Sequence, residues 1–291
     1  MTMSPHPEEL AIVTGASSGI GAATARELAR LGFHVLAGVR RNQDADAMRE
    51  PGIEPVMLDI TDPNHIQTLA DRVYGDPRGR AVRALVNNAG IPVNVPVEVY
   101  PLDAWRRLFE VNLFGHVAMT QALLPALVRS KGRVVNISSV GGKVAMATYG
   151  PYAGTKFALE AVSDALRREI APSGVRVIVV EPGGVRTDML GRASTIAREL
   201  AATMTPEQGR RYDGLMHAVA AQTASAIEWS QTAEAVAEVI AKAVMARSPR
   251  TRYTVGRDAA LVTFLARVLP DWLLDRIVAT ALRPHFPKAG A

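Results

Sequence analysis

Six short runs rich in β-branched and other apolar residues alternate with stretches of helix length along the chain. The runs cover residues 11–16, 34–40, 55–61, 84–90, 133–139 and 175–183, and a seventh follows at 252–255. Near-continuous apolar strands that alternate with helices are typical of parallel strands covered on both faces. The pattern predicts an α/β fold with a doubly wound parallel sheet of about seven strands.

Five stretches between these runs have the length and the apolar spacing of helices. They cover Gly19–Leu31, Pro63–Tyr74, Leu102–Arg129, Tyr152–Ala171 and Thr232–Met245. A helix between consecutive parallel strands forms a right-handed crossover. The sequence contains no internal repeat and no low-complexity linker. Residues 1–291 are therefore expected to form a single domain, with its core at about 8–256.

Two segments fit the alternating pattern less well. Residues 186–230 follow the sixth strand, where ligands bind in an open α/β sheet, so they are either a substrate lid or an ordinary surface insertion. Residues 257–291 predict a C-terminal helical extension, with Leu261, Leu265, Val268, Trp272 and Leu273 at near-helical spacing. No apolar run in the extension approaches the length of a membrane span. It could pack on the core, cover the substrate cleft, form a subunit interface or lie on a membrane surface.

The composition excludes several kinds of site. The chain has no cysteine, which rules out disulfides, thiolate metal sites and cysteine nucleophiles. Its 6 histidines include no H-x-x-x-H pair, so no metal site is expected. The net charge is +5, but the arginines are spread over the chain and form no run of five or six, so no nucleic-acid partner is expected. The polar and acidic residues 1–9 differ from a secretory signal, which favours a cytoplasmic protein.

A glycine-rich stretch, TGASSGIG, follows the first strand at Thr14–Gly21. Gly15 allows the tight turn out of the strand, Gly19 lets the backbone approach a pyrophosphate, and Gly21 lets the helix pack close to the sheet. The helix N-terminus that follows offers unpaired N–H groups to phosphates. Between the first strand and the first helix of a doubly wound sheet, this turn predicts a dinucleotide site.

The end of the second strand indicates which dinucleotide is bound. NAD favours an acidic side chain here, which holds the adenosine ribose, but the sequence has Val39 followed by Arg40 and Arg41. A guanidinium suits a phosphate on that ribose instead. NADP(H) is therefore expected in preference to NAD(H). A solvated loop arginine would give the same sequence, and NAD is then the alternative.

Two serines, two tyrosines and a lysine lie close together within residues 138–156. On a helix that begins at Tyr152, Lys156 lies one turn later on the same face, whereas the corresponding partner of Tyr149 is Ala153. A lysine ammonium about 4 Å from a phenol contributes on the order of 4 kcal/mol, which would lower the phenol pKa by roughly three units. The sequence therefore predicts that Tyr152 exchanges a proton near neutral pH.

These motifs resemble those of the short-chain dehydrogenases/reductases with a Tyr-x-x-x-Lys signature. The resemblance rests on TGASSGIG, on NNAG at 87–90, on Asn112 in VNLFG, on a serine thirteen residues before YAGTK, and on PGGVRTDM from Pro182. It covers roughly residues 8–256, with the motifs in the family's order. The resemblance implies a Rossmann fold and an NAD(P)-dependent oxidoreductase that acts on CH–OH groups.

The resemblance also implies a role for each catalytic residue. Tyr152 is the general acid/base, and Ser139 holds the substrate oxygen by a hydrogen bond. Lys156 also binds the nicotinamide ribose, and Asn112, which could otherwise only bend its helix, supports a water through which the lysine relays protons. The thirteen-residue spacing selects Ser139, and Ser138 on the opposite side of the strand is left a structural or cofactor-side role.

The cofactor residues that the resemblance implies come from all the glycine and strand-end motifs. They are Thr14, Gly15, Ser17, Ser18, Gly19, Ile20, Gly21, Arg40, Asp59, Ile60, Asn88, Ala89, Gly90, Tyr152, Lys156, Pro182, Gly183, Val185 and Thr187. Asn87 is expected to be structural.

The residues expected around the substrate are small or apolar. They lie in GGKVAMATYGP and MLGRAS and include Met146, Tyr149 and Met189. A hydrophobic pocket suits a secondary alcohol or ketone such as a steroid, a retinoid or another lipid-like compound. The branch resembled includes hydroxysteroid and retinol dehydrogenases, and the family implies a homodimer or homotetramer. The alternative is an NAD(P)-binding lipid carrier or regulatory protein without turnover.

Overall fold

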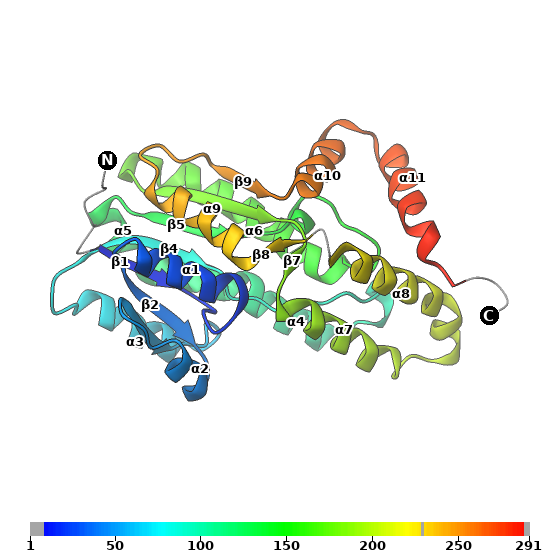
Figure 1. Cartoon of the computed structure of the whole chain (residues 1–291), viewed down its shortest axis with the longest axis horizontal. Coiled ribbons are helices and arrows are strands. Elements are labelled where there is room, and N and C mark those ends of the chain that lie inside the picture. The colour runs from blue at the N-terminus through cyan, green and yellow to red at the C-terminus, as the bar shows by residue number, and fades with distance from the viewer. Residues whose placement is uncertain (1–8, 228–229, 288–291) are drawn as a thin grey trace.

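Seven parallel strands form the central sheet in the computed structural model, which describes residues 9–227 and 230–287. The strands are β1 (Glu9–Val13), β2 (His34–Val39), β3 (Ile53–Met57), β4 (Ala81–Asn87), β5 (Arg133–Ile137), β6 (Arg176–Pro182) and β9 (Arg252–Val255). Their order is β3-β2-β1-β4-β5-β6-β9, so the chain winds outward from β1 first in one direction and then in the other (Figure 1). The predicted doubly wound sheet is confirmed. Positions 1–8, 228–229 and 288–291 of the predicted segments lie outside the described residues.

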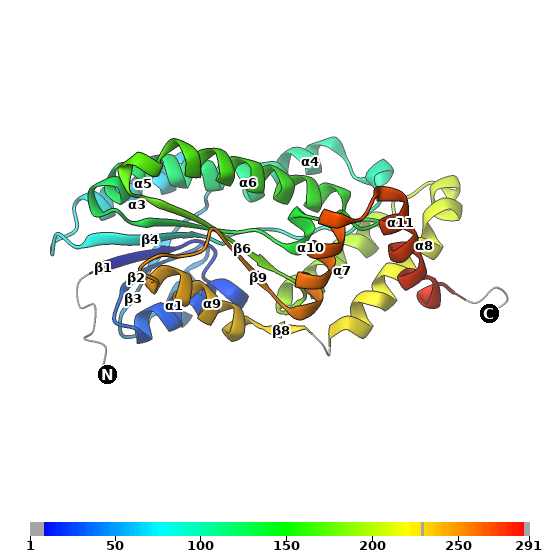
Figure 2. The same cartoon turned by 90° about the horizontal axis from the view of Figure 1, so that it is seen from above.

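Helices cover both faces of the sheet (Figure 2). One face carries α1 (Gly19–Arg30) and α9 (Ala233–Met245), and the other carries α3 (Pro63–Tyr74), α5 (Gly115–Ser130) and α6 (Gly150–Glu169). Each face has its own buried apolar cluster, as expected for strands that are apolar on both sides. The predicted helices are all present. The sequence pattern missed the short α2 (Asn42–Ala47), which has no buried residue and therefore no apolar periodicity.

The long helix predicted at 102–129 is interrupted in its middle. It consists of α4 (Leu102–Phe109), a π-helical turn at Glu110–Phe114, and α5. By length and composition, Leu102–Ser130 is the one stretch of the described residues that could cross a membrane, but 56% of its most apolar window is buried inside the structure. Core helices of globular proteins pass the same test. Here α5 packs against β4 and α3.

The segment after β6 is helical and lies beyond the carboxyl ends of the strands (Figure 1). Two short strands, β7 (Val185–Arg186) and β8 (Gln231–Thr232), pair at its base. Between them lie α7 (Asp188–Ala201) and α8 (Pro206–Ala226). The segment predicted as a lid or insertion is therefore a pair of helices that stands beside the ligand-binding edge of the sheet.

The C-terminal extension forms α10 (Arg257–Val268) and α11 (Asp271–Leu282), which confirms the predicted helices. Core packing, one of the four uses that the sequence left open, is met only in part. Ala259 and Leu282 are buried, whereas Leu261, Val268 and Trp272 are 58%, 54% and 67% exposed. The chain turns at Gly256, which has a φ of +111°, and then α10 contacts β9 while α11 packs on α8.

A buried chain of polar side chains links β4, β5 and two helices. The Asn87 amide donates to Asn136 Oδ1 at 2.9 Å and to Thr120 Oγ1 at 3.0 Å. The Asn136 amide in turn donates to Ser163 Oγ of α6 at 2.8 Å. These bonds confirm a structural role for Asn87 and hold α6 in register with the end of β5.

Replacing Asn136 by alanine is expected to destabilise the protein. The Asn87 amide and the Ser163 hydroxyl would each lose a buried partner, so the free energy of unfolding should fall by about 2 kcal/mol. Denaturant unfolding followed by circular dichroism measures this. Asn64→Ala, at an exposed position of α3, is the matched control and should stay within about 0.5 kcal/mol of the wild type. Equal stabilities of the two variants would contradict the role given to the polar chain.

Candidate functional site

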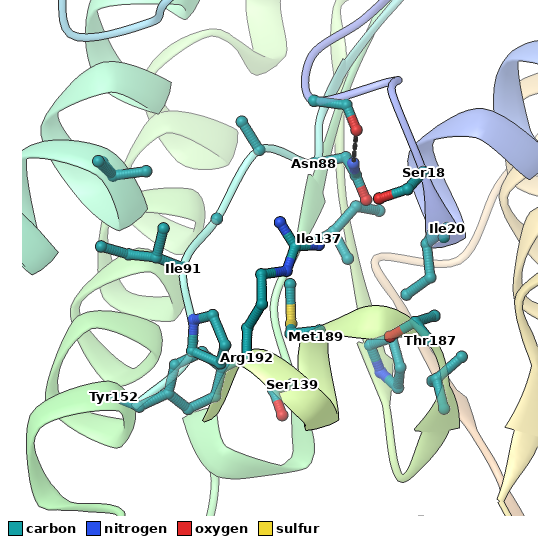
Figure 3. Close-up of a pocket in the computed structure, with 18 of the residues that line it drawn as sticks. Ser18, Ile20, Asn88, Ile91, Ile137, Ser139, Tyr152, Thr187, Met189 and Arg192 are labelled. Atoms are coloured by element: carbon teal, nitrogen blue, oxygen red, sulfur yellow. Dashed lines mark hydrogen bonds between the residues drawn. The ribbon is translucent and has the colours of Figure 1, made fainter. Parts of the chain in front are cut away.

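A pocket opens at the carboxyl ends of the strands, where the order of the chain reverses between β1 and β4. It is lined by every predicted catalytic and cofactor residue except Thr14, Gly21 and Asn112. Figure 3 shows Ser18, Ile20 and Asn88 at one end of this pocket and Ser139 and Tyr152 at the other. Residues that are far apart in the sequence thus form one elongated site.

Thr14 and Gly21 shape the glycine turn from behind. The Thr14 hydroxyl accepts hydrogen bonds from the backbone N–H groups of Asn88 and Ala89, each at 3.0 Å. At Gly21 an added Cβ would lie 2.2 Å from the carbonyl oxygen of Gly15, so only glycine allows α1 to start this close to the turn. This agrees with the close packing that the sequence predicts for Gly21.

Asn112 lies in the π-helical turn and is fully buried. Its Oδ1 accepts from the Ile91 N–H at 2.9 Å, and its Nδ2 donates to the Ile91 carbonyl at 3.0 Å and to Thr155 Oγ1 at 3.3 Å. The side chain therefore fastens the loop after β4 to α6. Its part in a proton relay stays a prediction.

The glycine turn has the shape that a dinucleotide phosphate requires. Gly15 and Gly19 have φ values of +64° and +54°. An added Cβ at Gly15 would lie 2.7 Å from the Cα of Ala89. No side chain caps the first turn of α1, so its N–H groups are available to an anion. Arg40 lines the far end of the same pocket, so the residues present fit a dinucleotide with its phosphates over the turn.

The catalytic end is held together by α6 and β5. Lys156 Nζ donates to the carbonyl oxygen of Ile137, the last residue of β5, at 2.8 Å and lies 5.7 Å from the centre of the Tyr152 ring. Ser139 Oγ accepts from the Gly141 N–H at 3.1 Å. Tyr152 and Lys156 therefore face the same ligand space, as their i, i+4 spacing predicts.

Burial sets the proton affinities at this end of the pocket. Burial raises the pKa of Tyr152 to about 12, and the hydrogen bond with Ser139 opposes the rise. Burial also lowers the pKa of Lys156 to about 8, against the attraction of Glu160. The expected lowering of the phenol pKa by the lysine is wrong for this structure, because the ammonium points to the Ile137 carbonyl and desolvation dominates. At neutral pH the phenol is therefore a proton donor.

Ser138 is less suited to catalysis than its neighbour. Its Oγ is buried, has no hydrogen-bond partner in the part of the chain that the structure describes, and would lie 2.7 Å from a Cβ added at Gly142. Its side chain thus packs against the turn at 140–142, whereas Ser139 interacts with Tyr152. The geometry agrees with the choice of Ser139.

Behind the site, an ion cluster joins β9 to three segments that contribute to the pocket. Glu160 of α6 accepts from Lys143 Nζ at 2.7 Å and from Arg252 of β9 at 3.0 Å. Lys143 also lies 3.5 Å from Glu181, whose pKa is raised by burial. Within residues 9–227 and 230–287, no group of three or more His, Asp or Glu side chains could hold a metal ion.

Sequence reasoning missed part of the pocket lining. The additional residues are Gly38, Val39, Leu58, Ile91, Pro92, Asn94, Val111, Ile137, Ser138, Val140 and Gly184. The expected substrate stretches contribute Tyr149, Met189, Arg192 and Ala193 to the lining. Three of them, Met189, Arg192 and Ala193, lie at i, i+3 and i+4 on α7. All three belong to the predicted substrate stretch MLGRAS, but the small and apolar character of that stretch drew no attention to the charge of Arg192.

Comparison with known proteins agrees with this geometry. Residues 9–198 match the family model described as short chain dehydrogenase. The chain belongs to the short-chain dehydrogenase family. The predicted resemblance, fold and enzyme class are thereby confirmed: the protein is an oxidoreductase that acts on CH–OH groups and binds NADP(H).

Two relatives and one solved structure illustrate the relationship. The chain is 35% identical to retinol dehydrogenase 5 of Mus musculus, over 96% of this chain and 90% of that protein. It is 32% identical to estradiol 17-beta-dehydrogenase 2 of Mus musculus, over 97% and 77%. A short-chain dehydrogenase from Burkholderia cenocepacia J2315, solved in complex with NADP, has a TM-score of 0.72 at 25% identity and aligns over 93% of this chain and 97% of its own.

The pKa values of this short-chain dehydrogenase predict how carbonyl reduction depends on pH. As the pH rises through about 8, Lys156 loses the charge that stabilises a developing phenolate, while Tyr152 stays protonated until about 12. The kcat/KM for NADPH-dependent reduction should therefore fall above about pH 8. Burial lowers the pKa of His116 to about 3, so the titration of His116 does not change kcat/KM near neutral pH.

Steady-state rates from about pH 6 to 10 measure this profile. The control is Lys131→Gln, at the C-terminal end of α5 and away from the pocket. This variant should show the same fall in kcat/KM at high pH as the wild type. A rate that is constant over this range in the wild type would contradict the assignment to Lys156.

Proposed function

We propose that the protein interconverts a hydrophobic secondary alcohol and its ketone, with NADP(H) as the preferred hydride carrier. The observation that carries this proposal is the position of the buried Tyr152 phenol, which lines the pocket together with Ser139 and several apolar residues, and whose pKa burial raises to about 12. A buried proton donor next to a hydroxyl donor suits a carbonyl oxygen that becomes an alkoxide.

Each side chain of the site has its own role in the proposed reaction. The bound nicotinamide supplies or accepts the hydride. In reduction, Ser139 donates a hydrogen bond to the carbonyl oxygen and Tyr152 transfers its proton to that oxygen; in oxidation Tyr152 takes the proton back. Lys156, held by the Ile137 carbonyl, keeps a positive charge near the phenol as the proton leaves. Asn112 and Thr155 keep α6 and the loop after β4 in place around these groups.

Arg40 supports the preference for NADP(H) over NAD(H). It lines the adenosine end of the pocket next to Val39, where an acidic side chain would favour NAD. Its neighbour Arg41 is bound to Asp44, with an Nη2–Oδ1 distance of 2.7 Å. Asp59, the one carboxylate among the described residues of the lining, accepts from the Thr61 hydroxyl at 2.7 Å. Arg40 is thus the cation at this end that is suited to a ribose 2′-phosphate.

The lining of the catalytic end supports a lipid-like substrate. Ile91, Pro92, Val140 and Met189 surround the space next to Tyr152, and such surfaces bind apolar ligands. The names of the two relatives refer to retinol and estradiol, which are alcohols of this kind. A steroid, a retinoid or another lipid-like carbonyl compound is the proposed substrate class, and α7, which borders the same space, is the proposed lid.

The exposed apolar side chains of α10 and α11, among them Phe264 at 60% and Trp272 at 67%, form a surface that supports self-association. A homodimer or homotetramer is proposed on that ground. From the sequence, we also propose that this surface can contact a membrane and that the protein is cytoplasmic.

The Tyr152→Phe variant tests the proposed chemistry. Steroids, retinoids and aliphatic ketones are screened for NADPH consumption, and the variant should lose a factor of about 10² to 10⁴ in kcat because the general acid is missing. NADPH affinity should change little. Tyr74→Phe, whose hydroxyl bonds the Ala122 carbonyl on the helical face, is the matched control with wild-type turnover. Native rates in Tyr152→Phe would exclude the mechanism, and NADPH binding without turnover on any substrate would favour a carrier or regulator.

Cofactor preference is tested by titrating the protein with NADPH and with NADH and following the fluorescence of the bound nicotinamide. NADPH should bind at least about tenfold more tightly, since one charge-assisted phosphate contact contributes roughly that factor. Arg40→Met should remove most of the difference, and Arg49→Met on the exposed surface after α2 should leave it. Tighter binding of NADH by the wild type would refute the preference.

A further inference from the structure

Arg192 extends into the dinucleotide pocket from α7. It lines the pocket together with Met189 and Ala193, one helical turn of α7 facing the ligand space. In Figure 3 its guanidinium lies between the Ser18–Asn88 end and the Ser139–Tyr152 end. The sequence places Arg192 in the MLGRAS stretch expected near the substrate but gives the residue no role, and the proposed mechanism does not use it.

The Arg192 guanidinium has no partner within the described residues. No hydrogen bond or ion pair joins it to another described side chain, whereas Arg198, two turns along the same helix, donates to Thr195 Oγ1 at 3.3 Å. Among the residues that the structure describes, the pocket lining holds three cations, Arg40, Lys156 and Arg192, and a single carboxylate, Asp59. Asp59 lies at the end of β3, where Thr61 and Arg107 surround it. Arg192 therefore faces the pocket without an anion.

The position of α7 determines which anion is within reach. Its N-cap, Thr187, lies against the start of α1, since a Cβ added at Gly19 would be 3.1 Å from Thr187 Cγ2. The phosphates of a bound dinucleotide lie over that start of α1. Arg192 is little more than one turn further along α7, and an arginine side chain spans such a distance. A bidentate guanidinium also matches the oxygens of a diphosphate.

We propose that Arg192 binds the pyrophosphate of the dinucleotide and so fastens α7 over the bound cofactor. The proposal rests on the cofactor binding stated above and not on the identity of the substrate. It gives the segment 186–230 a specific function: cofactor binding closes one wall of the substrate space. Ile196, Ala197 and Leu200 of α7 pack in the same apolar cluster as Tyr152, so fastening α7 also orders the surroundings of the catalytic phenol.

The contact between Arg192 and the pyrophosphate can form only when the dinucleotide is bound. Without the dinucleotide, the wall formed by α7 lacks the contact that holds it, and a substrate would meet an incompletely formed site. With the dinucleotide present, Met189 and Ala193 are held against the ligand space together with Arg192. This is a population shift driven by a contact that exists only in the bound state.

The test compares NADPH and NADH, which share the pyrophosphate and differ in the 2′-phosphate. Arg192→Met keeps an apolar stem of similar length and removes the charge. By fluorescence titration without substrate, it should weaken the binding of both dinucleotides by roughly tenfold and by the same factor. Arg40→Met should weaken NADPH alone. Arg198→Met, on the same helix but outside the pocket lining, should bind both like the wild type.

Hydrogen exchange provides a second measurement that does not depend on turnover. Saturating NADPH should slow amide exchange in residues 188–201 of the wild type and of Arg198→Met, and should slow it much less in Arg192→Met. Circular dichroism checks that each variant is folded.

Three outcomes would overturn the proposal. Unchanged affinities for both dinucleotides, with a raised KM for a carboxylate-bearing substrate, would make Arg192 a substrate residue. A loss confined to NADPH would place it at the 2′-phosphate. A wild type that binds neither dinucleotide would refute the proposed cofactor use together with this inference. In contrast, tight binding of both dinucleotides without any turnover would refute the proposed reaction and leave Arg192 as a pyrophosphate contact.

Discussion

Helix α6 is held against the carboxyl end of β5 by two buried hydrogen bonds, and the catalytic side chains take their positions from that contact. One bond joins Lys156 Nζ to the Ile137 carbonyl and the other joins Asn136 to Ser163, each at 2.8 Å. Ser139 follows β5 and Tyr152 lies in the first turn of α6, so this contact brings the two hydroxyl groups to one place. Asn112 fastens the loop after β4 to the same helix. A register shift of α6 would therefore displace the proton donor, the lysine and the loop that borders the substrate together.

The same burial that orders the site also determines its proton chemistry. A phenol and an ammonium that are both removed from water lose their charged forms, which raises the pKa of Tyr152 to about 12 and lowers that of Lys156 to about 8. The Coulomb attraction between a phenolate and an ammonium is strong only when the two charges lie close together. The ammonium, 5.7 Å from the ring centre, is instead bonded to a carbonyl group. A site arranged in this way holds its proton on the tyrosine and is prepared for carbonyl reduction.

The pocket is long because both the sheet and helix α7 line it. The sheet supplies a rigid floor, with the glycine turn, Arg40 and the strand ends in positions that the parallel ladder determines. The α7 helix adds a wall that depends on few contacts with the sheet. Such a wall can change its position when the cofactor binds, because a phosphate provides the unpaired arginine with an anionic partner. Cofactor recognition and formation of the substrate space are thereby coupled through one helix.

The amino-acid sequence by itself determined the sheet, the order of its crossovers, the dinucleotide turn and the placement of Tyr152 and Lys156 on one helix face, because these depend on local periodicity and on spacings within one element. Only the tertiary structure decided that Asn112 forms hydrogen bonds with the Ile91 backbone, that Leu261 and Trp272 are exposed, and that Arg192 faces the pocket. It also decided that burial, and not the neighbouring charge, sets the phenol pKa. The physical reason is the same in each case: desolvation and pairing depend on which distant segments pack together, and residue spacing along one chain does not contain that information.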